Sequence, residues 1–118
     1  MQRIGGIIQL QANGVLYDCK GAFTYNLGRN LKSGVAGSDR VHGFKEAPQV
    51  PFIAGKITDR AGLSVKTLLD LQDATITLTV GNGKTIVLGG ACFASEGTID
   101  TEEGEIEVRF EGDSCEEV

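Results

Sequence analysis

His42, the single histidine of the chain, follows Asp39 within the stretch GSDRVHGFKEAPQVPF at residues 37–52. A histidine oriented by a carboxylate can act as a general base when a reacting group lies within hydrogen-bond reach. The hydroxyls nearby in the sequence, Ser33 and Ser38, belong to no nucleophile motif. We therefore interpret His42 as a packing or hydrogen-bonding residue rather than a catalytic one.

Two other patterns resemble chemical motifs but lack a requirement of each. GNGKT at 81–85 resembles the end of a phosphate-binding P-loop, but that motif requires glycine where the chain has Leu78. The acids Glu102, Glu103 and Glu105 could form a glycosidase pair or a calcium site, yet they lack the D-x-D-x-D-G spacing and fit a solvated face. The sequence thus predicts no enzyme, no catalytic residue and no cofactor.

The three cysteines, Cys19, Cys92 and Cys115, are widely spaced and form no C-x-x-C pair. With one histidine in the chain they give no zinc-ligand pattern, so we predict no metal site. A free cysteine usually behaves as a small buried hydrophobe, which we expect of Cys19 and Cys92. Cys115 lies in an acidic tail, where we expect it to be exposed.

Length and composition indicate one soluble domain over residues 1–118. Hydrophobic residues make up 41% of the chain and charged residues 23%, as in ordinary globular proteins. No apolar run approaches the roughly 20 residues that cross a bilayer, and MQRIGGIIQL lacks the features of a signal peptide. We expect folding in a cytoplasm and no membrane partner.

The net charge of −5 is unevenly distributed. Residues 96–118 contain ten acids and one arginine, for a net charge of −9, whereas residues 1–95 have a net charge of +4. The acidic end is either a solvated face or a surface that meets a basic region of another copy. The candidate for that basic region contains Arg29, Lys32, Arg40 and Lys45. A pI near 4.8 argues against sequence-specific nucleic-acid binding.

The elements that carry these residues are mostly strands. IIQLQ (7–11) and VLYDCKGAFTYNL (15–27) predict a hairpin around Asn13-Gly14, because Asn-Gly supplies the positive φ angles of a tight primed turn. Strand-like composition or alternation predicts further strands at 50–58, 74–80, 84–90 and 105–111.

A helix is expected at about 63–72, capped by Ser64 or Asp59. Its apolar stripe would contain Val65, Leu68, Leu69 and Gln72. The predicted fold class is therefore mainly β: a sandwich or barrel of about seven strands with one flanking α-helix.

Residues 28–50 interrupt this pattern with several glycines, Pro48 and few large apolar groups. We predict a long loop here, and loops of this length are usually functional or disordered.

In this order, the segments resemble the tail tube protein of Mu-like contractile-tailed phages. The resemblance is carried by RIGGIIQLQANGVLYDCKGAFTYNLG, GVAGSDRVHGFKEAPQVPFIAGKITD, GLSVKTLLDLQDATITLT, the NGKT hairpin and the close EVRFEGDSCEEV. It covers essentially the whole chain, and its most distinctive runs are G-V-x-G, V-H-G-F and P-F-I-x-x-x-I-T-D.

The resemblance implies a structural virion protein that polymerises as stacked hexameric rings into a hollow tail tube, through which phage DNA is ejected into the host. The implied partners are further copies of the chain, the tail sheath, the tape-measure protein, and the baseplate and tail terminator proteins. DNA would pass through the lumen without specific binding. Assembly would take place in the host cytoplasm.

Three candidate sites follow from this resemblance. The inter-subunit loop contains Arg29, Lys32, Arg40, His42, Phe44, Lys45 and Phe52. The lumen face, where few bases mean few phosphate contacts, contains Asp18, Lys20, Thr24, Asn26, Thr75, Thr77 and Thr79. The acidic partner surface contains Glu102, Glu103, Glu105, Glu107 and Glu111. We expect the loop to fold against a neighbouring copy, with its bases near the acidic surface.

Three other interpretations stay open. A tube subunit of a type VI secretion system or of a phage-tail-like bacteriocin would share the physics and differ in its partners. A monomeric β-barrel binding module would have an internal apolar pocket and would not polymerise. An enzyme that uses His42 would lose its activity in His42→Ala.

Overall fold

The computed structural model describes residues 8–37 and 39–118, without the side chains of residues 41 and 42. The start of the first predicted strand, Ile7, and the hydroxyl of Ser38 therefore lie outside the described residues. The elements are β1 (Gln9–Ala12), β2 (Val15–Asn26), β3 (Leu31–Ala36), β4 (Val41–Ala47), β5 (Phe52–Thr58), α1 (Val65–Leu69), β6 (Ala74–Thr79), β7 (Thr85–Phe93), β8 (Ile99–Asp100), β9 (Glu105–Glu111) and β10 (Ser114–Glu117). The prediction of a mainly β fold with one helix is confirmed.

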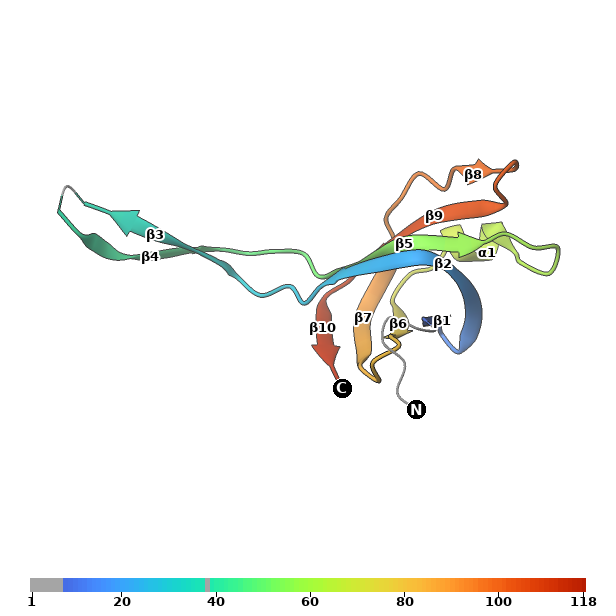
Figure 1. Ribbon diagram of the computed structural model, residues 1–118, viewed down its shortest axis with the longest axis horizontal. Coiled ribbons are helices and arrows are strands. Elements are labelled where there is room, and N and C mark those ends of the chain that lie inside the picture. Colours follow the sequence, from blue (N-terminus) through green and yellow to red (C-terminus); the bar gives the residue numbers. More distant parts are fainter. Residues whose placement is uncertain (1–7, 38) are drawn as a thin grey trace.

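Six antiparallel strands close into a barrel in the order β7-β6-β1-β2-β5-β9, with β9 pairing back onto β7 (Figure 1). The closure is short: Cys92 lies opposite Glu111, and Phe93 lies opposite Phe110. The rings of Phe93 and Phe110 meet edge to face with their centroids 5.6 Å apart, the geometry that aromatic quadrupoles favour. Outside the ring, β10 extends the sheet from β7, and β8 extends it from β9.

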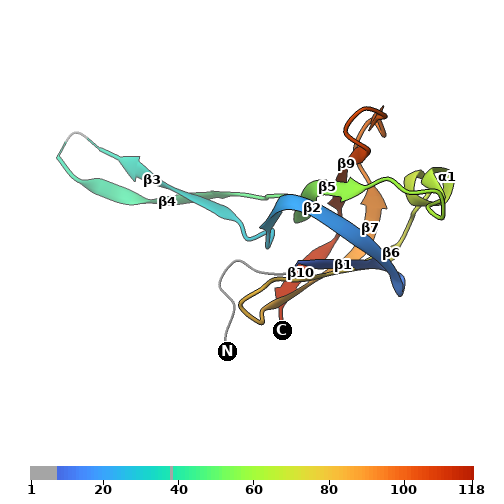
Figure 2. The ribbon, with the colours of Figure 1, turned by 45° about the vertical axis from the view of Figure 1, so that its right-hand side comes forward.

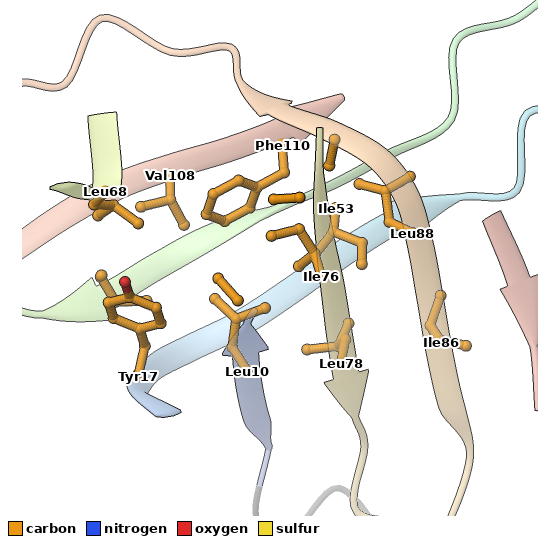
Figure 3. Packing of buried hydrophobic residues seen from close by; sticks show 14 of the residues in the cluster. Leu10, Tyr17, Ile53, Leu68, Ile76, Leu78, Ile86, Leu88, Val108 and Phe110 are labelled. Atoms are coloured by element: carbon orange, nitrogen blue, oxygen red, sulfur yellow. The ribbon is translucent and has the colours of Figure 1, made fainter. Parts of the chain in front are cut away.

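Alternation along the strands fills the barrel with aliphatic and aromatic side chains (Figure 3). The largest fully buried side chains are those of Leu10, Ile53, Ile57, Leu68, Ile76, Leu78, Ile86, Leu88, Ile106, Val108 and Phe110. Every barrel strand contributes to this cluster, so the barrel interior is a packed core.

The β1–β2 turn follows the sequence prediction, since Asn13 and Gly14 have φ angles of 50° and 85°. Further along, β2 carries extra residues: Lys20 pairs with Lys56, but Thr24 pairs with Ala54. This bulge places the ring of Phe23 over Gly55, where a Cβ atom would lie 2.6 Å from the ring. Gly55 is therefore needed for close packing rather than for its backbone conformation.

Helix α1 begins after Ser64, whose hydroxyl accepts a hydrogen bond from the backbone N–H of Thr67. It is shorter than the predicted 63–72. Leu68 is fully buried, Val65 and Leu69 are half-buried, and Gln72 lies beyond the helix. The helix lies at the end of the barrel away from β3 and β4 (Figure 1). None of the described residues belongs to a helix of the length and apolarity that a membrane span requires.

Residues 28–37 and 39–50 form an arm that projects from the barrel (Figures 1 and 2), in a molecule of 62 × 39 × 27 Å. The prediction of a loop without secondary structure is wrong, because β3 and β4 pair antiparallel from Leu31↔Ala47 to Ala36↔Val41. Most of its described side chains are exposed, so the sequence has no burial-driven alternation to reveal the strands.

The base of the arm is tightly packed. Gly28 has a φ of 76°, and a Cβ atom there would lie 2.8 Å from the Pro51 ring. Its N–H donates to the Asn26 side chain at 2.7 Å, and the Pro51 carbonyl accepts from Gly112 N at 3.1 Å. These contacts fix the direction in which the arm leaves the barrel.

Two of the three cysteine predictions are wrong. Cys92 is exposed, because it lies on the outward side of β7 at the closure. Cys115 is buried, because residues 114–117 form β10 instead of a free tail. Cys19 is half-buried, and burial, followed by the charge of Asp18, raises the pKa of its thiol to about 11.

Gly55→Ala tests the Phe23 contact. The new methyl group would displace the ring, so we expect a loss of about 1–3 kcal/mol in the free energy of unfolding, measured by urea denaturation. Gly62→Ala is the matched control, because nothing lies within 4 Å of a Cβ atom there, and it should differ from the parent by less than about 0.5 kcal/mol. Equal stability of the two variants would contradict the packing described.

Candidate assembly surfaces

The arm exposes apolar side chains on both of its faces. The register places Leu31 and Val35 on one face and Phe44, opposite Gly34, on the other. Phe44 is 74% exposed, and Leu31 is 52% exposed. A two-stranded ribbon with no layer packed on it is marginal in water. The arm therefore has the features of a segment that is completed by another surface.

The predicted inter-subunit residues are placed in two regions. Arg29, Lys32, Arg40, Phe44 and Lys45 belong to the arm and are exposed. Lys32 pairs with Glu46 at 3.9 Å. Phe52 is instead half-buried in β5, where the guanidinium carbon of Arg109 lies 4.0 Å from its ring centroid. The side chain of His42 lies outside the described residues.

The threonines of β6 that were predicted as a lumen face lie beside the exposed residues of β1. Gln9 lies opposite Thr79 on one side and Asp18 on the other, and Gln11 lies opposite Thr77. Both glutamines are exposed, whereas Leu10, which lies between them, and Ala12, which follows Gln11, are buried. Gln9 and Gln11 were not among the predicted lumen residues, although the alternation in IIQLQA signals them.

The four predicted lumen residues of β2 do not all join this face. Asp18 does, and its carboxylate pairs with Arg60 at 2.7 Å. Lys20, Thr24 and Asn26 lie where β2 pairs with β5, on another part of the barrel wall. The amide of Asn26 bonds to Gln49 at 3.4 Å at the base of the arm. The structure thus divides the predicted lumen set into two groups.

Glu105 is the centre of an ion-pair cluster on the outside of the barrel. Its carboxylate lies 3.4 Å from Lys20 Nζ and 3.1 Å from Lys56 Nζ, and Lys20 also donates to the Glu103 carbonyl at 2.8 Å. The hydrogen bond from Lys56 holds the pKa of Glu105 below its usual range, and the same bond raises the pKa of Lys56. The cluster joins β2, β5 and β9.

The predicted acidic partner surface follows β9 and the turn before it, and basic side chains pair with part of it. Glu105 is neutralised by its two lysines, and Glu111 pairs with Arg109 at 2.8 Å, at the other end of β9. Glu102 and Glu103 lie in the β8–β9 turn, where their N–H groups donate to Asp100 Oδ1.

Glu107 is joined by Glu96 and Asp100 in the lining of a hollow of about 690 Å³, to which Glu105 also contributes. Glu96 and Asp100 were not predicted as site residues, because nothing local distinguishes them from other surface acids. Among the described residues, no group of three or more His, Cys, Asp or Glu side chains is arranged to hold a metal ion.

The structure thus combines a closed β-barrel, whose interior is filled by side chains, with a projecting arm that exposes apolar side chains. The sequence profile described as "Phage tail tube protein" matches residues 1–117. The chain therefore belongs to the phage tail tube family, a family of structural proteins of the phage tail. No curated protein matches it in sequence.

Two solved structures share the fold at low sequence identity. One is the sheath/tube terminator of PVC, an extracellular contractile injection system, in its extended state: TM-score 0.66 and 10% identity, over 95% of this chain and 93% of that one. The other is the tube-terminating cap of the anti-feeding prophage: TM-score 0.64 and 8% identity, over 100% of this chain and 94% of that one. At this identity the likeness establishes the fold alone.

Glu105→Gln tests the ion-pair cluster. A carboxyl whose pKa is lowered on folding stabilises the protein above its unfolded value of 4.5, and this stabilisation is lost as the pH falls through the lower folded pKa. We expect Glu105→Gln to lower the melting temperature at pH 7 and to weaken its fall below about pH 4.5. Glu102→Gln, a matched exposed acid in the adjacent turn, should keep the parent's acid dependence. If both variants gave the same pH profile, the cluster would have no role.

Proposed function

We propose that copies of this chain assemble as stacked hexameric rings into the hollow tail tube of a Mu-like contractile phage, through which DNA is ejected into the host. The observation that carries the proposal is the arm. It presents Phe44 on one face and Leu31 and Val35 on the other, away from the barrel core. Membership of the tail tube family supports the same conclusion.

Assembly would supply the burial that the arm lacks in one copy. Removing an exposed phenylalanine side chain from water contributes about 2 kcal/mol. Two aliphatic side chains on the opposite face would add comparable amounts, enough to order a marginal ribbon. An arm that reaches a different patch on the next copy forms a heterologous contact, and such contacts generate rings or filaments.

The outer face of β1 and β6 is our candidate for the lumen. Gln9, Gln11, Thr75, Thr77 and Thr79 give it hydroxyl and amide groups, and Arg60, which reaches its edge, is paired with Asp18. A lining with few lysines and arginines makes few phosphate contacts, so DNA could slide through it. Under this proposal Lys20 and Lys56 stay outside the lumen, held by Glu105.

The remaining parts of the proposal concern the tail around the tube. A contractile sheath would surround the tube, a tape-measure protein would occupy it before ejection, and baseplate and terminator proteins would close its two ends. Assembly would take place in the host cytoplasm, and the final location would be the tail of the virion.

A second candidate is a subunit that ends a tube rather than extends it. The two structural neighbours, a sheath/tube terminator and a tube-terminating cap, favour it. Tubes of type VI secretion systems and of phage-tail-like bacteriocins would use the same contacts with other partners. A monomeric binding module is disfavoured because side chains fill the barrel interior.

Negative-stain microscopy of the concentrated, purified chain tests these candidates. A tube subunit should form long hollow rods, whereas a terminator should form single rings that do not grow. A protein that stays monomeric at all concentrations would contradict both assembly proposals.

Phe44→Ser should abolish rods and rings, because it removes the largest exposed apolar group of the arm. Its free energy of unfolding should change by less than about 0.5 kcal/mol, since Phe44 packs on no core residue. Phe44→Tyr, which keeps the ring, is the matched control and should still assemble. If Phe44→Ser formed normal rods, Phe44 would not be part of the interface between copies.

A further inference from the structure

A long groove lies on the barrel wall along β5 and β9. Its two adjoining hollows, of about 690 and 520 Å³, share Lys56, Ser95 and Glu107 in their linings. Small residues, including Ala22, Ala54 and Ala94, line it beside the charged ones. Small-molecule pockets are mostly apolar with a few polar groups, so a lining this rich in charge fits a polypeptide better than a compact ligand.

The acidic charge of the groove is only partly neutralised within the chain. Lys20 and Lys56 pair with Glu105, and Arg109, which lines the second hollow, pairs with Glu111. Glu96 and Glu107 are exposed and form no ion pair among the described residues, and Asp100 lines the same hollow. The groove thus offers these three carboxylates together with small side chains.

The arm has the complementary properties. Four basic residues and two acids lie between positions 29 and 47, and one of these acids, Glu46, is already paired with Lys32. Arg40 and Lys45 are exposed, and Lys45 lies opposite Ser33, on the arm face that carries the exposed Leu31 and Val35. The basic and apolar side chains of the arm are therefore complementary to the carboxylates and small side chains of the groove.

The arm cannot reach the groove of its own chain. It projects from one end of the 62 Å long axis, whereas β8 and the start of β9, which carry Asp100 and Glu105, lie toward the opposite end (Figure 1). The base of the arm is fixed by the Gly28–Pro51 contact, which opposes folding back. The arm of a second copy can occupy the groove, and in a head-to-tail contact each copy both provides a groove and inserts an arm.

We propose that the groove between β5, β9 and residues 94–100 is the docking site for the β3–β4 arm of a second copy. Glu96 and Glu107 face Arg40 and Lys45 of that arm, and Leu31 and Val35, on the same face as Lys45, lie against the small residues. This inference rests on the proposed assembly function and specifies the surface that the arm uses.

A charge exchange between two variants tests this pairing. Glu96→Lys with Glu107→Lys reverses the groove, and Arg40→Glu with Lys45→Glu reverses the arm. Each double variant alone should need at least about tenfold more protein to assemble at low salt, because like charges then face each other. A 1:1 mixture of the two should recover assembly, since each reversed arm then meets a groove of opposite charge. Asp70→Lys, an exposed acid at the end of α1, is the control and should assemble like the parent.

Photo-crosslinking gives a second readout that does not depend on the charge variants. With benzoylphenylalanine at position 35, on the same arm face as Lys45, the assembled protein should crosslink to the tryptic peptide 85–109, which contains Glu96 and Glu107. Crosslinks confined to other peptides, such as 67–84, would overturn the docking site, as would normal assembly of the reversed-groove variant. Failure of the mixture to recover would also overturn it. In all these cases the parent assembles and the proposed function stands, whereas a parent that never assembles would contradict both.

Discussion

The pairing of β7 with β9 closes the barrel, and the rest of the structure depends on this short closure. Once Cys92 meets Glu111 and Phe93 meets Phe110, the inward side chains of six strands are sealed into one core. Helix α1 adds Leu68 to this core, whereas the arm projects from the barrel with most of its described side chains exposed. The outer faces of the strands are then left to meet water or a partner.

Two walls of the closed barrel and the arm differ in the side chains that they expose. The wall of β1 and β6 carries glutamines and threonines, the wall of β5 and β9 carries a charged groove, and Gly28 and Pro51 direct the arm away from both. Glu105 pairs with Lys20 and Lys56 on the second of these walls. A chain with a projecting arm at one end and an acidic groove toward the other has the asymmetry that head-to-tail assembly requires.

The barrel could be predicted from the sequence because burial imposes alternation. ATITLTV and EIEVRFE show this pattern, and the Asn13-Gly14 turn is equally local. The arm strands could not be predicted, since no core face imposes a period on them. The burial of Cys115 depends on β10 pairing with β7, a contact between distant parts of the chain. The ion pairs within the predicted acidic surface could not be predicted for the same reason: its five glutamates are close in sequence, but the fold places Glu105 against lysines and leaves Glu107 unpaired in the groove.

Hydrogen exchange of the arm amides tests the central claim most directly, which is that a second copy orders the arm. In dilute monomer, the amides of Leu31–Ala36 and Val41–Ala47 should exchange far faster than those of β5 and β9, because few contacts protect a lone ribbon. In assembled protein, the same arm amides should slow by about two orders of magnitude or more while the barrel amides change little. Arm amides that are as protected in the monomer as those of the barrel, or unchanged on assembly, would contradict the account.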